Sequence, residues 1–220
     1  MAMDRSGSRL VTADEMKRLD ENTITEHGMS SAVLMERAAL AVVETLREED
    51  FDLSRVLAVC GPGNNGGDGI AAARLLHIDG CDATVVFVGD REKRSEETRL
   101  QWRIAESYGV EIVDLRAAVD SGLFAEATTV IDCIFGIGGG RAPAGDFLDA
   151  VRMINRSGAS GAEVLAVDIP SGVSADTGEA VGEAITADAT VTFAYKKVGH
   201  DRPPGNELSG DVIVKDIGIY

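Results

Sequence analysis

The sequence has few cysteines, histidines and aromatic residues, and each shortage excludes a class of protein. The three cysteines, Cys60, Cys81 and Cys133, are odd in number, and no two of them have C-x-x-C spacing. This excludes a small domain held together by disulfides, and we expect reduced, apolar cysteines in a cytoplasmic protein. The three histidines stand singly, so no zinc-binding pattern is present. Aromatic residues make up only 5% of the chain.

Basic residues are also scarce, and their shortage argues against nucleic acid as a partner. There are 21 Lys and Arg against 37 Asp and Glu, which gives a net charge of −16. Such a field repels nucleic acids and anionic membranes at long range. No apolar run approaches the roughly 18 residues of a transmembrane helix, and residues 1–8 lack the apolar core of a signal peptide. We therefore expect neither a nucleic-acid nor a membrane partner.

What the chain does contain is the material of a glycine-rich α/β domain. Hydrophobic residues make up 45% of the 220 residues, and 25 residues are glycine. This length and composition indicate one domain with a large buried core. We assign residues 1–10 to a disordered N-terminal tail and residues 11–220 to the domain.

Hydrophobic periodicity predicts alternating strands and helices. A capping box at residues 12–15 predicts a first helix, and a second follows Ser30. Alternation of this kind indicates a Rossmann-like three-layer α/β/α sandwich with a mostly parallel sheet. No helix is evident between the last two strands, so we expect a mixed or antiparallel C-terminal edge. Later helices are expected at 69–79, 92–108, 117–124 and 146–155, and strands at 56–60, 84–88, 111–113, 129–134, 164–167, 189–194 and 211–217.

The loop after the first expected strand carries the strongest ligand-binding signal. Residues 61–66 match the dinucleotide fingerprint G-x-G-x-x-G between a strand and a helix. Glycines there let backbone N–H groups approach a phosphate, and the helix N-terminus attracts anions. The lysine of a P-loop is missing. A tight strand–helix turn would explain the glycines equally well, although Asn64, Asn65 and Asp68 add donors and acceptors for a polar ligand.

Two later loops leave expected strands with unusual residues. Asp132 lies within an apolar strand, where an acid is costly unless it is hydrogen-bonded or bound to a cation. The glycines at 138–140 predict a phosphate-gripping loop anchored by Arg141, although a surface ion pair would also explain this arginine. Asp168 ends another strand, and ligands of open α/β sheets bind beyond the carboxyl ends of strands. Lys197 faces either the same crevice or solvent.

Together these motifs resemble the YjeF N-terminal domain family, the NAD(P)HX epimerases. The resemblance is carried by GPGNNGGDG at 61–69, by Asp132 with the FGIG that follows, and by DIPSG at 168–172, in this order. The stretch LMERA at 34–38 and residues 192–197 are also similar to that family. The resemblance implies interconversion of the R and S forms of hydrated NADH and NADPH. It also implies potassium binding, a homodimer, and functional coupling to an NAD(P)HX dehydratase, which accepts only the S form.

The resemblance further implies roles for individual residues. Asp168 is the expected catalytic residue, and the potassium ligands would be Asn65, Asp132 and Ser171, whose oxygens suit a hard cation. Residues implied to contact the hydrated dinucleotide are Asn64, Asn65, Gly66, Gly67, Asp68, Gly136, Ile137, Gly138, Gly139, Gly140, Arg141, Ala142 and Asp168.

Two other functions compete with the epimerase. Some relatives use this fold as a binding or assembly module, a role that the acidic charge and the intact Asp132 and Asp168 oppose. An NAD(P)-dependent oxidoreductase would use the G-x-G-x-x-G loop, with Asp90 as ribose partner, but neither a Tyr-x-x-x-Lys pair nor a catalytic histidine is evident.

Overall fold

The computed structural model describes residues 9–138, 140 and 142–220, and its centre is a parallel sheet. The sheet has seven strands in the order β4-β3-β2-β5-β6-β7-β9. The expected Rossmann-like architecture is therefore confirmed, with the order reversing at β2, as in other doubly wound sheets. The strands are β2 (Val56–Cys60), β3 (Ala83–Phe87), β4 (Glu111–Asp114), β5 (Thr129–Cys133), β6 (Glu163–Val167), β7 (Ala189–Phe193) and β9 (Asp211–Lys215).

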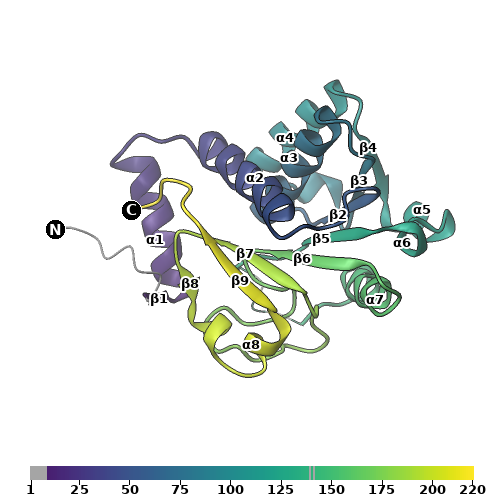
Figure 1. The fold of residues 1–220 in the computed structure, drawn as a ribbon. Helices are drawn as coiled ribbons and strands as arrows, with labels where there is room; N and C mark the ends of the chain where they lie inside the picture. The colour runs from purple at the N-terminus through teal and green to yellow at the C-terminus, as the bar shows by residue number, and fades with distance from the viewer. Residues whose placement is uncertain (1–8, 139, 141) are drawn as a thin grey trace.

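Helices cover both faces of the sheet and bury a core on each side (Figure 1). One face packs against α2 (Ser31–Glu48), α3 (Asn64–Ile78) and α4 (Glu96–Ser107). The other packs against α5 (Leu115–Asp120), α6 (Leu123–Glu126) and α7 (Asp146–Ala159). In β2, Ala58 and Cys60 point to the first core, whereas Leu57 and Val59 point to the second. A strand buried on both faces is apolar throughout, so the continuous apolar run at 56–60 indicates a strand that is covered on both sides.

Helix α1 (Ala13–Thr25) and several shorter elements complete the structure. Thr12 forms the predicted capping box with Glu15 and starts α1. β1 (Leu10–Val11) pairs with β8 (Lys196–Lys197), so the paired chain begins one residue before the predicted domain boundary. Of the predicted tail at residues 1–10, residues 1–8 lie outside the described residues. The remaining elements are η1 (Arg91–Lys93), η2 (Val198–Asp201) and α8 (Gly205–Leu208).

The expected mixed edge of the sheet is wrong, because β9 pairs with β7 in parallel from Ala189↔Asp211 to Phe193↔Lys215. A parallel neighbour requires a crossover that returns the chain to the same end of the sheet. β8, η2 and α8 form this crossover. These elements are too short to give a helical pattern in the sequence, so the return could not be predicted from periodicity.

The predicted start of α3 is also wrong, because this helix begins at Asn64 rather than Gly69. The glycines allow close packing of the helix on the sheet. A Cβ on Gly66 would lie 1.8 Å from the Gly61 carbonyl oxygen, and one on Gly69 would lie 2.6 Å from Cys133 Sγ. Asn64, Asn65 and Asp68 therefore lie on the first turns of a rigid helix rather than in a loop.

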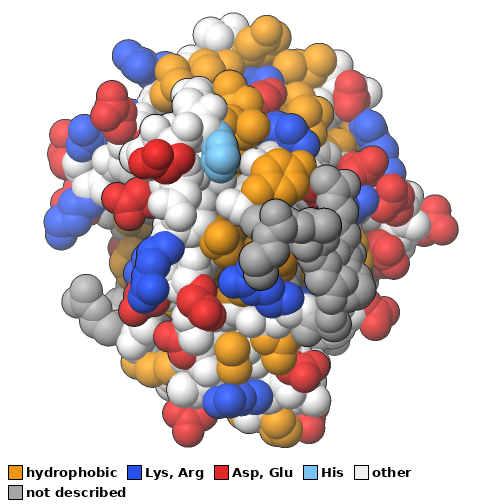
Figure 2. All heavy atoms as spheres, turned by 90° about the vertical axis from the view of Figure 1, so that its left-hand side faces the viewer, with side chains coloured by type: hydrophobic (Ala, Val, Ile, Leu, Met, Phe, Trp, Pro, Cys, Tyr) orange, Lys and Arg blue, Asp and Glu red, His pale blue; other side chains and the backbone are white. Residues whose placement is uncertain are grey.

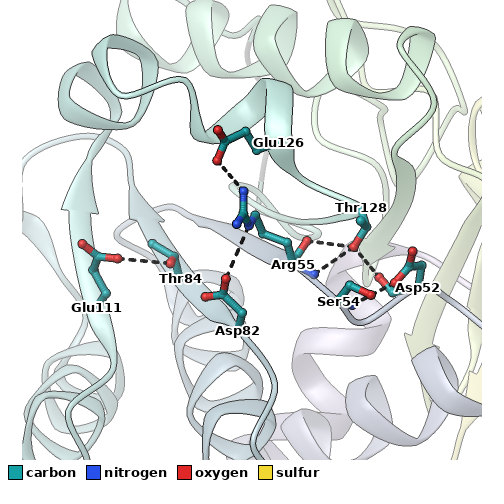
Figure 3. A network of polar contacts seen from close by, with 8 residues as sticks. All are labelled: Asp52, Ser54, Arg55, Asp82, Thr84, Glu111, Glu126 and Thr128. Carbon is teal, nitrogen blue, oxygen red and sulfur yellow. Dashed lines mark hydrogen bonds and ion pairs between the residues drawn. The ribbon is translucent and has the colours of Figure 1, made fainter.

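Polar contacts hold the amino ends of the central strands, far from the carboxyl ends that carry the loops (Figure 3). The Arg55 guanidinium reaches Glu126 and lies 3.4 Å from Asp82. The Arg55 backbone N–H donates to Thr128 Oγ1 at 2.9 Å. These residues are suitable positions for control substitutions. Among the described residues, no helix combines the length and apolar character needed to cross a membrane.

Candidate active site

A cavity of about 500 Å³ opens at the carboxyl ends of the central strands. Its floor comes from α3, from the segment after β5 and from Asp168 after β6. Its other walls come from α1, through Met16, Lys17 and Asp20, from α2, through Leu34 and Met35, and from the C-terminal segment, through Ile217 and Ile219. The face of the molecule that carries α1 shows acidic and basic side chains interspersed around a hydrophobic area (Figure 2).

The first turn of α3 presents an unsatisfied amide to the site. Asn65 is 8% exposed and lines the cavity, and neither its Oδ1 nor its Nδ2 has a hydrogen-bond partner among the described residues. A buried polar group without a partner costs about 1–3 kcal/mol. The N-cap residue Gly63 provides no side-chain cap, so the helix N-terminus is also available to a ligand. Both features favour binding of a polar, anionic molecule.

Behind the cavity wall, Asp132 and Ser171 form a buried hydrogen-bonded pair. Ser171 Oγ donates to Asp132 Oδ1 and its backbone N–H to Oδ2, both at 2.7 Å. Ile134 N–H donates to Oδ1 at 3.2 Å. Burial raises the pKa of Asp132 to about 6, although these hydrogen bonds favour the charged form. The sequence left two explanations for a buried Asp132, a structural hydrogen bond or a bound cation, and the structure shows the hydrogen bond.

The potassium prediction depends on oxygen ligands from Asn65, Asp132 and Ser171. No group of three or more His, Cys, Asp or Glu side chains suited to a metal occurs in the described part of the chain. Potassium does not need such a cluster, since it takes neutral amide, hydroxyl and carbonyl oxygens. The unpaired Asn65 Oδ1 is the feature that fits a cation here.

Asp168 forms an ion pair at the centre of the site. Its Oδ1 lies 2.5 Å from Lys197 Nζ, and Ile137 N–H donates to Oδ2 at 3.2 Å. Lys197 is fully buried and also donates to Thr192 Oγ1 at 2.7 Å. Burial alone would raise the pKa of Asp168, but the charge and hydrogen bond of Lys197 outweigh it and hold that pKa below its usual value. Asp168 is therefore an ionised carboxylate.

The backbone of Asp168 has a φ of 71°, which is rare for a residue other than glycine. Its N–H donates to the Val191 carbonyl at 2.7 Å, so β7 holds this conformation. Unusual backbone conformations of this kind concentrate at functional sites. The bend turns the carboxylate towards the cavity and towards Lys197.

The predicted substrate residues divide into four groups. Gly66 and Gly67 are buried packing residues, and Gly140 and Ala142 are exposed but outside the cavity lining. Gly139 and Arg141 lie outside the described residues. Those that line the cavity are Asn64, Asn65, Asp68, Gly136, Ile137, Gly138 and Asp168.

Several residues that line the cavity were not predicted from the sequence to belong to the site. Lys17, Asp20 and Ile217 belong to segments far from the motif loops, and only the tertiary structure brings them there. The amphipathic pattern of α1 predicts a helix but not which helix covers the site. Asp90, the candidate ribose partner, uses its carboxylate to accept from Glu92 N–H at 2.9 Å and so caps η1.

The fold and the site define a Rossmann-like protein with a polar ligand site at the carboxyl ends of its strands. The family model described as YjeF-related protein N-terminus matches residues 31–199. The chain belongs to this family.

Curated relatives extend the match to nearly the whole chain. An NAD(P)H-hydrate epimerase of Levilactobacillus brevis is 43% identical over 97% of this chain and 95% of its own. One of Weissella koreensis is 45% identical, covering 96% and 91%. The crystal structure of yeast ynu0 shares the fold, with a TM-score of 0.81 at 20% identity over 94% of this chain and 88% of its own. The predicted family and the predicted epimerase function are confirmed by these relatives.

Proposed function

We propose that the cavity binds the hydrated nicotinamide ring of NADHX and NADPHX and interconverts their R and S epimers. The observation that carries this proposal is the Asp168–Lys197 ion pair beside the unsatisfied Asn65 amide in a cavity of about 500 Å³. The ion pair supplies fixed charge, and the amide supplies a donor and an acceptor for a polar ligand. NADHX and NADPHX combine a polar ring with an anionic pyrophosphate, which fits both features.

Epimerisation at C6 of the ring can pass through a planar cation. The C6–O bond breaks as the ring nitrogen shares its electron pair, and water then adds to the opposite face. An ionised Asp168 stabilises this cation electrostatically, because a preorganised charge in a water-poor site acts strongly. This role fits a carboxylate that Lys197 keeps deprotonated better than the roles of acid or base do.

The rest of the dinucleotide extends from the cavity along the N-terminus of α3. There Gly63 leaves open space, since a Cβ on it would meet no atom within 4 Å. The backbone N–H groups at the helix start bind the pyrophosphate, and Asn64 is exposed beside them. Lys17 on α1 is the exposed cation of the cavity lining and pairs with no described acid, so it also faces this anion.

We also propose that potassium binds next to the substrate. Asn65, Asp132 and Ser171 would hold the ion, which would supply positive charge near the dinucleotide. The unpaired Asn65 Oδ1 supports this proposal. Potassium should raise the melting temperature of the wild type, and Asn65→Ala should lose this response, as expected for a ligand that binds only the folded state. Equal responses to potassium and to tetramethylammonium would contradict the ion site.

The biological setting follows from the chemistry of the product. The reaction supplies the S epimer, so an NAD(P)HX dehydratase that consumes this epimer is the expected functional partner, in the cytoplasm. We further expect a homodimer. Sedimentation equilibrium at micromolar concentration would test that state, and a monomer mass throughout would contradict it.

The direct test mixes the enzyme with pure R-NADHX and follows S-NADHX by chromatography, after subtraction of the spontaneous rate. We expect the wild type to accelerate the exchange, and Asp168→Asn to slow it by at least ~100-fold while the fold and binding persist. Asp82→Asn is the matched control, since Asp82 lies at the opposite end of the strands (Figure 3). Near-wild-type exchange by Asp168→Asn would remove Asp168 from catalysis.

A further inference from the structure

Asp68 is the one acid of the GNNGGDG motif, and unlike Asp168 it has no hydrogen-bond or ion-pair partner among the described residues. It lies on α3, one turn after Asn64, and lines the same cavity. Asp168 is held by Lys197, Ile137 and Thr192, whereas no described residue donates a hydrogen bond to the Asp68 carboxyl group or forms an ion pair with it. An acid left without a donor in a cavity has its oxygens available to a substrate.

The charges that face Asp68 are mostly negative. Asp168 and Asp20 both act on it, and Glu97 on α4 acts in turn on Asp20. Lys197, the buried cation of the cavity lining, is already bound to Asp168.

Other titratable groups around the cavity do not offset these acids. Cys133 lies below α3, and burial raises the pKa of its thiol well above the usual value. Burial lowers the pKa of His200 on η2 to about 4, so this side chain is neutral. Lys17 lies at the exposed wall of the cavity. Burial first, and then the charges of Asp168 and Asp20, raise the pKa of Asp68 well above its usual value.

We propose that Asp68 is a catalytic residue that donates a proton to the departing C6 hydroxyl, while the ionised Asp168 stabilises the ring cation. This inference rests on the proposed epimerase function. It assigns different tasks to two carboxyl groups in one cavity, separated by their environments. Pairs of titratable groups whose surroundings push their pKa values apart are typical of acid–base catalysis.

The step balances without any further reactant. The Asp68 proton passes to the hydroxyl oxygen, the C6–O bond breaks, and its electron pair leaves with the oxygen as water. The nitrogen lone pair forms the N1=C6 bond of the planar cation. When water adds to the opposite face, this π pair returns to nitrogen and the released proton restores a neutral Asp68. The products differ from the reactants only in the configuration at C6.

The test compares Asp68→Ala with Asp82→Ala in the R-NADHX exchange assay, with circular dichroism as the fold control. We expect Asp68→Ala to lose at least ~100-fold in kcat, the lower part of the range for general acid–base catalysis, and Asp82→Ala to lose little. At constant pH, rising acetic acid concentration should restore part of the rate of Asp68→Ala only. Alanine leaves room for this small acid, whereas a purely structural defect would not respond to it.

A second measurement applies even where Asp68→Ala fails to fold. The wild-type kcat should fall at alkaline pH, because the acid must be protonated, and the folded conservative variant Asp68→Asn should lack this limb. A wild type without epimerase activity would refute the proposed function. An active wild type with a flat alkaline profile, or a folded Asp68→Ala with near-wild-type kcat, would refute only the role of Asp68.

Discussion

Replacing Lys197 by methionine should destabilise the protein strongly, because it leaves a carboxylate without its cation. The Lys197 side chain is 1% exposed and that of Asp168 is 14% exposed, and their charged atoms lie 2.5 Å apart. Methionine retains most of the side-chain volume, so the loss of charge dominates over the loss of packing. Removing one partner of a buried pair costs about 3–5 kcal/mol.

The value for Lys197→Met should fall near the lower end of that range. Asp168 still accepts from Ile137 N–H and lies 3.4 Å from Thr192 Oγ1, so two donors remain beside the carboxylate. For a protein of this size, 3 kcal/mol corresponds to a fall in melting temperature of roughly 6–12 °C. Burial without the cation should also raise the pKa of Asp168.

Urea unfolding followed by circular dichroism would measure the loss, and a double variant would identify its cause. Lys197→Met combined with Asp168→Asn removes the orphaned charge, so it should be more stable than Lys197→Met alone by at least ~1 kcal/mol. If Lys197→Met unfolds within ~0.5 kcal/mol of the wild type, the ion pair does not hold Asp168 in the folded protein. Additive losses in the double variant would equally refute the coupling.

Four further substitutions test separate parts of the site. Gly63→Val places a side chain in open space at the ligand entrance, so it should weaken NADPHX binding at least ~10-fold, as measured by calorimetry, without unfolding the protein. Gly66→Ala places a Cβ against the Gly61 carbonyl oxygen, so it should lower the free energy of unfolding by ~1–3 kcal/mol in a urea titration. His200 has a folded pKa of about 4 against 6.5 in the unfolded chain, so the unfolded chain binds more protons and stability falls by up to about 3 kcal/mol as pH drops from 6.5 to 4. His200→Asn should lose this slope in urea titrations across that range, and an unchanged slope would contradict the assignment. Lys17→Met should raise KM by ~2–5-fold with kcat unchanged in steady-state assays, as expected for an exposed charge that contacts only the pyrophosphate.

The sheet and most helices were predictable because their signals are local. The strand at 56–60 is apolar throughout and ends at Gly61, and the structure has β2 at the same residues. Thr12 and Glu15 form the capping box that their spacing predicts. Such patterns involve neighbours in the sequence, so no knowledge of tertiary contacts is needed.

The start of α3 was mispredicted for a tertiary reason. Glycine is unfavourable within a helix, so the residues at 64–69 resembled a loop. Gly66 and Gly69 are required there because the Gly61 backbone and the Cys133 side chain approach too closely for a Cβ. Packing against distant residues outweighs the local propensity, and the sequence alone does not show which residues approach.

The candidate site was predictable in its residues but not in its electrostatics. Motif order identified Asp68, Asp132 and Asp168, while the pairing of Asp168 with Lys197 depends on a crossover that periodicity does not reveal. The left-handed backbone of Asp168 gives no signal in the sequence either. An aspartate is written identically in the sequence whether a cation, a hydroxyl group or no partner lies beside its carboxylate in the fold.

The three acids of the site show how one residue type acquires three states. Asp168 is ionised because Lys197 outweighs its burial. Asp132 is buried among donors, and its pKa rises only to about 6 because hydrogen bonds from Ser171 and Ile134 oppose burial. Asp68 has neither a cation nor a donor among the described residues, so burial and the neighbouring carboxylates Asp168 and Asp20 raise its pKa well above its usual value. In the proposed reaction the ionised Asp168 stabilises the planar cation and Asp68 supplies the proton, and these two tasks need carboxyl groups in different environments.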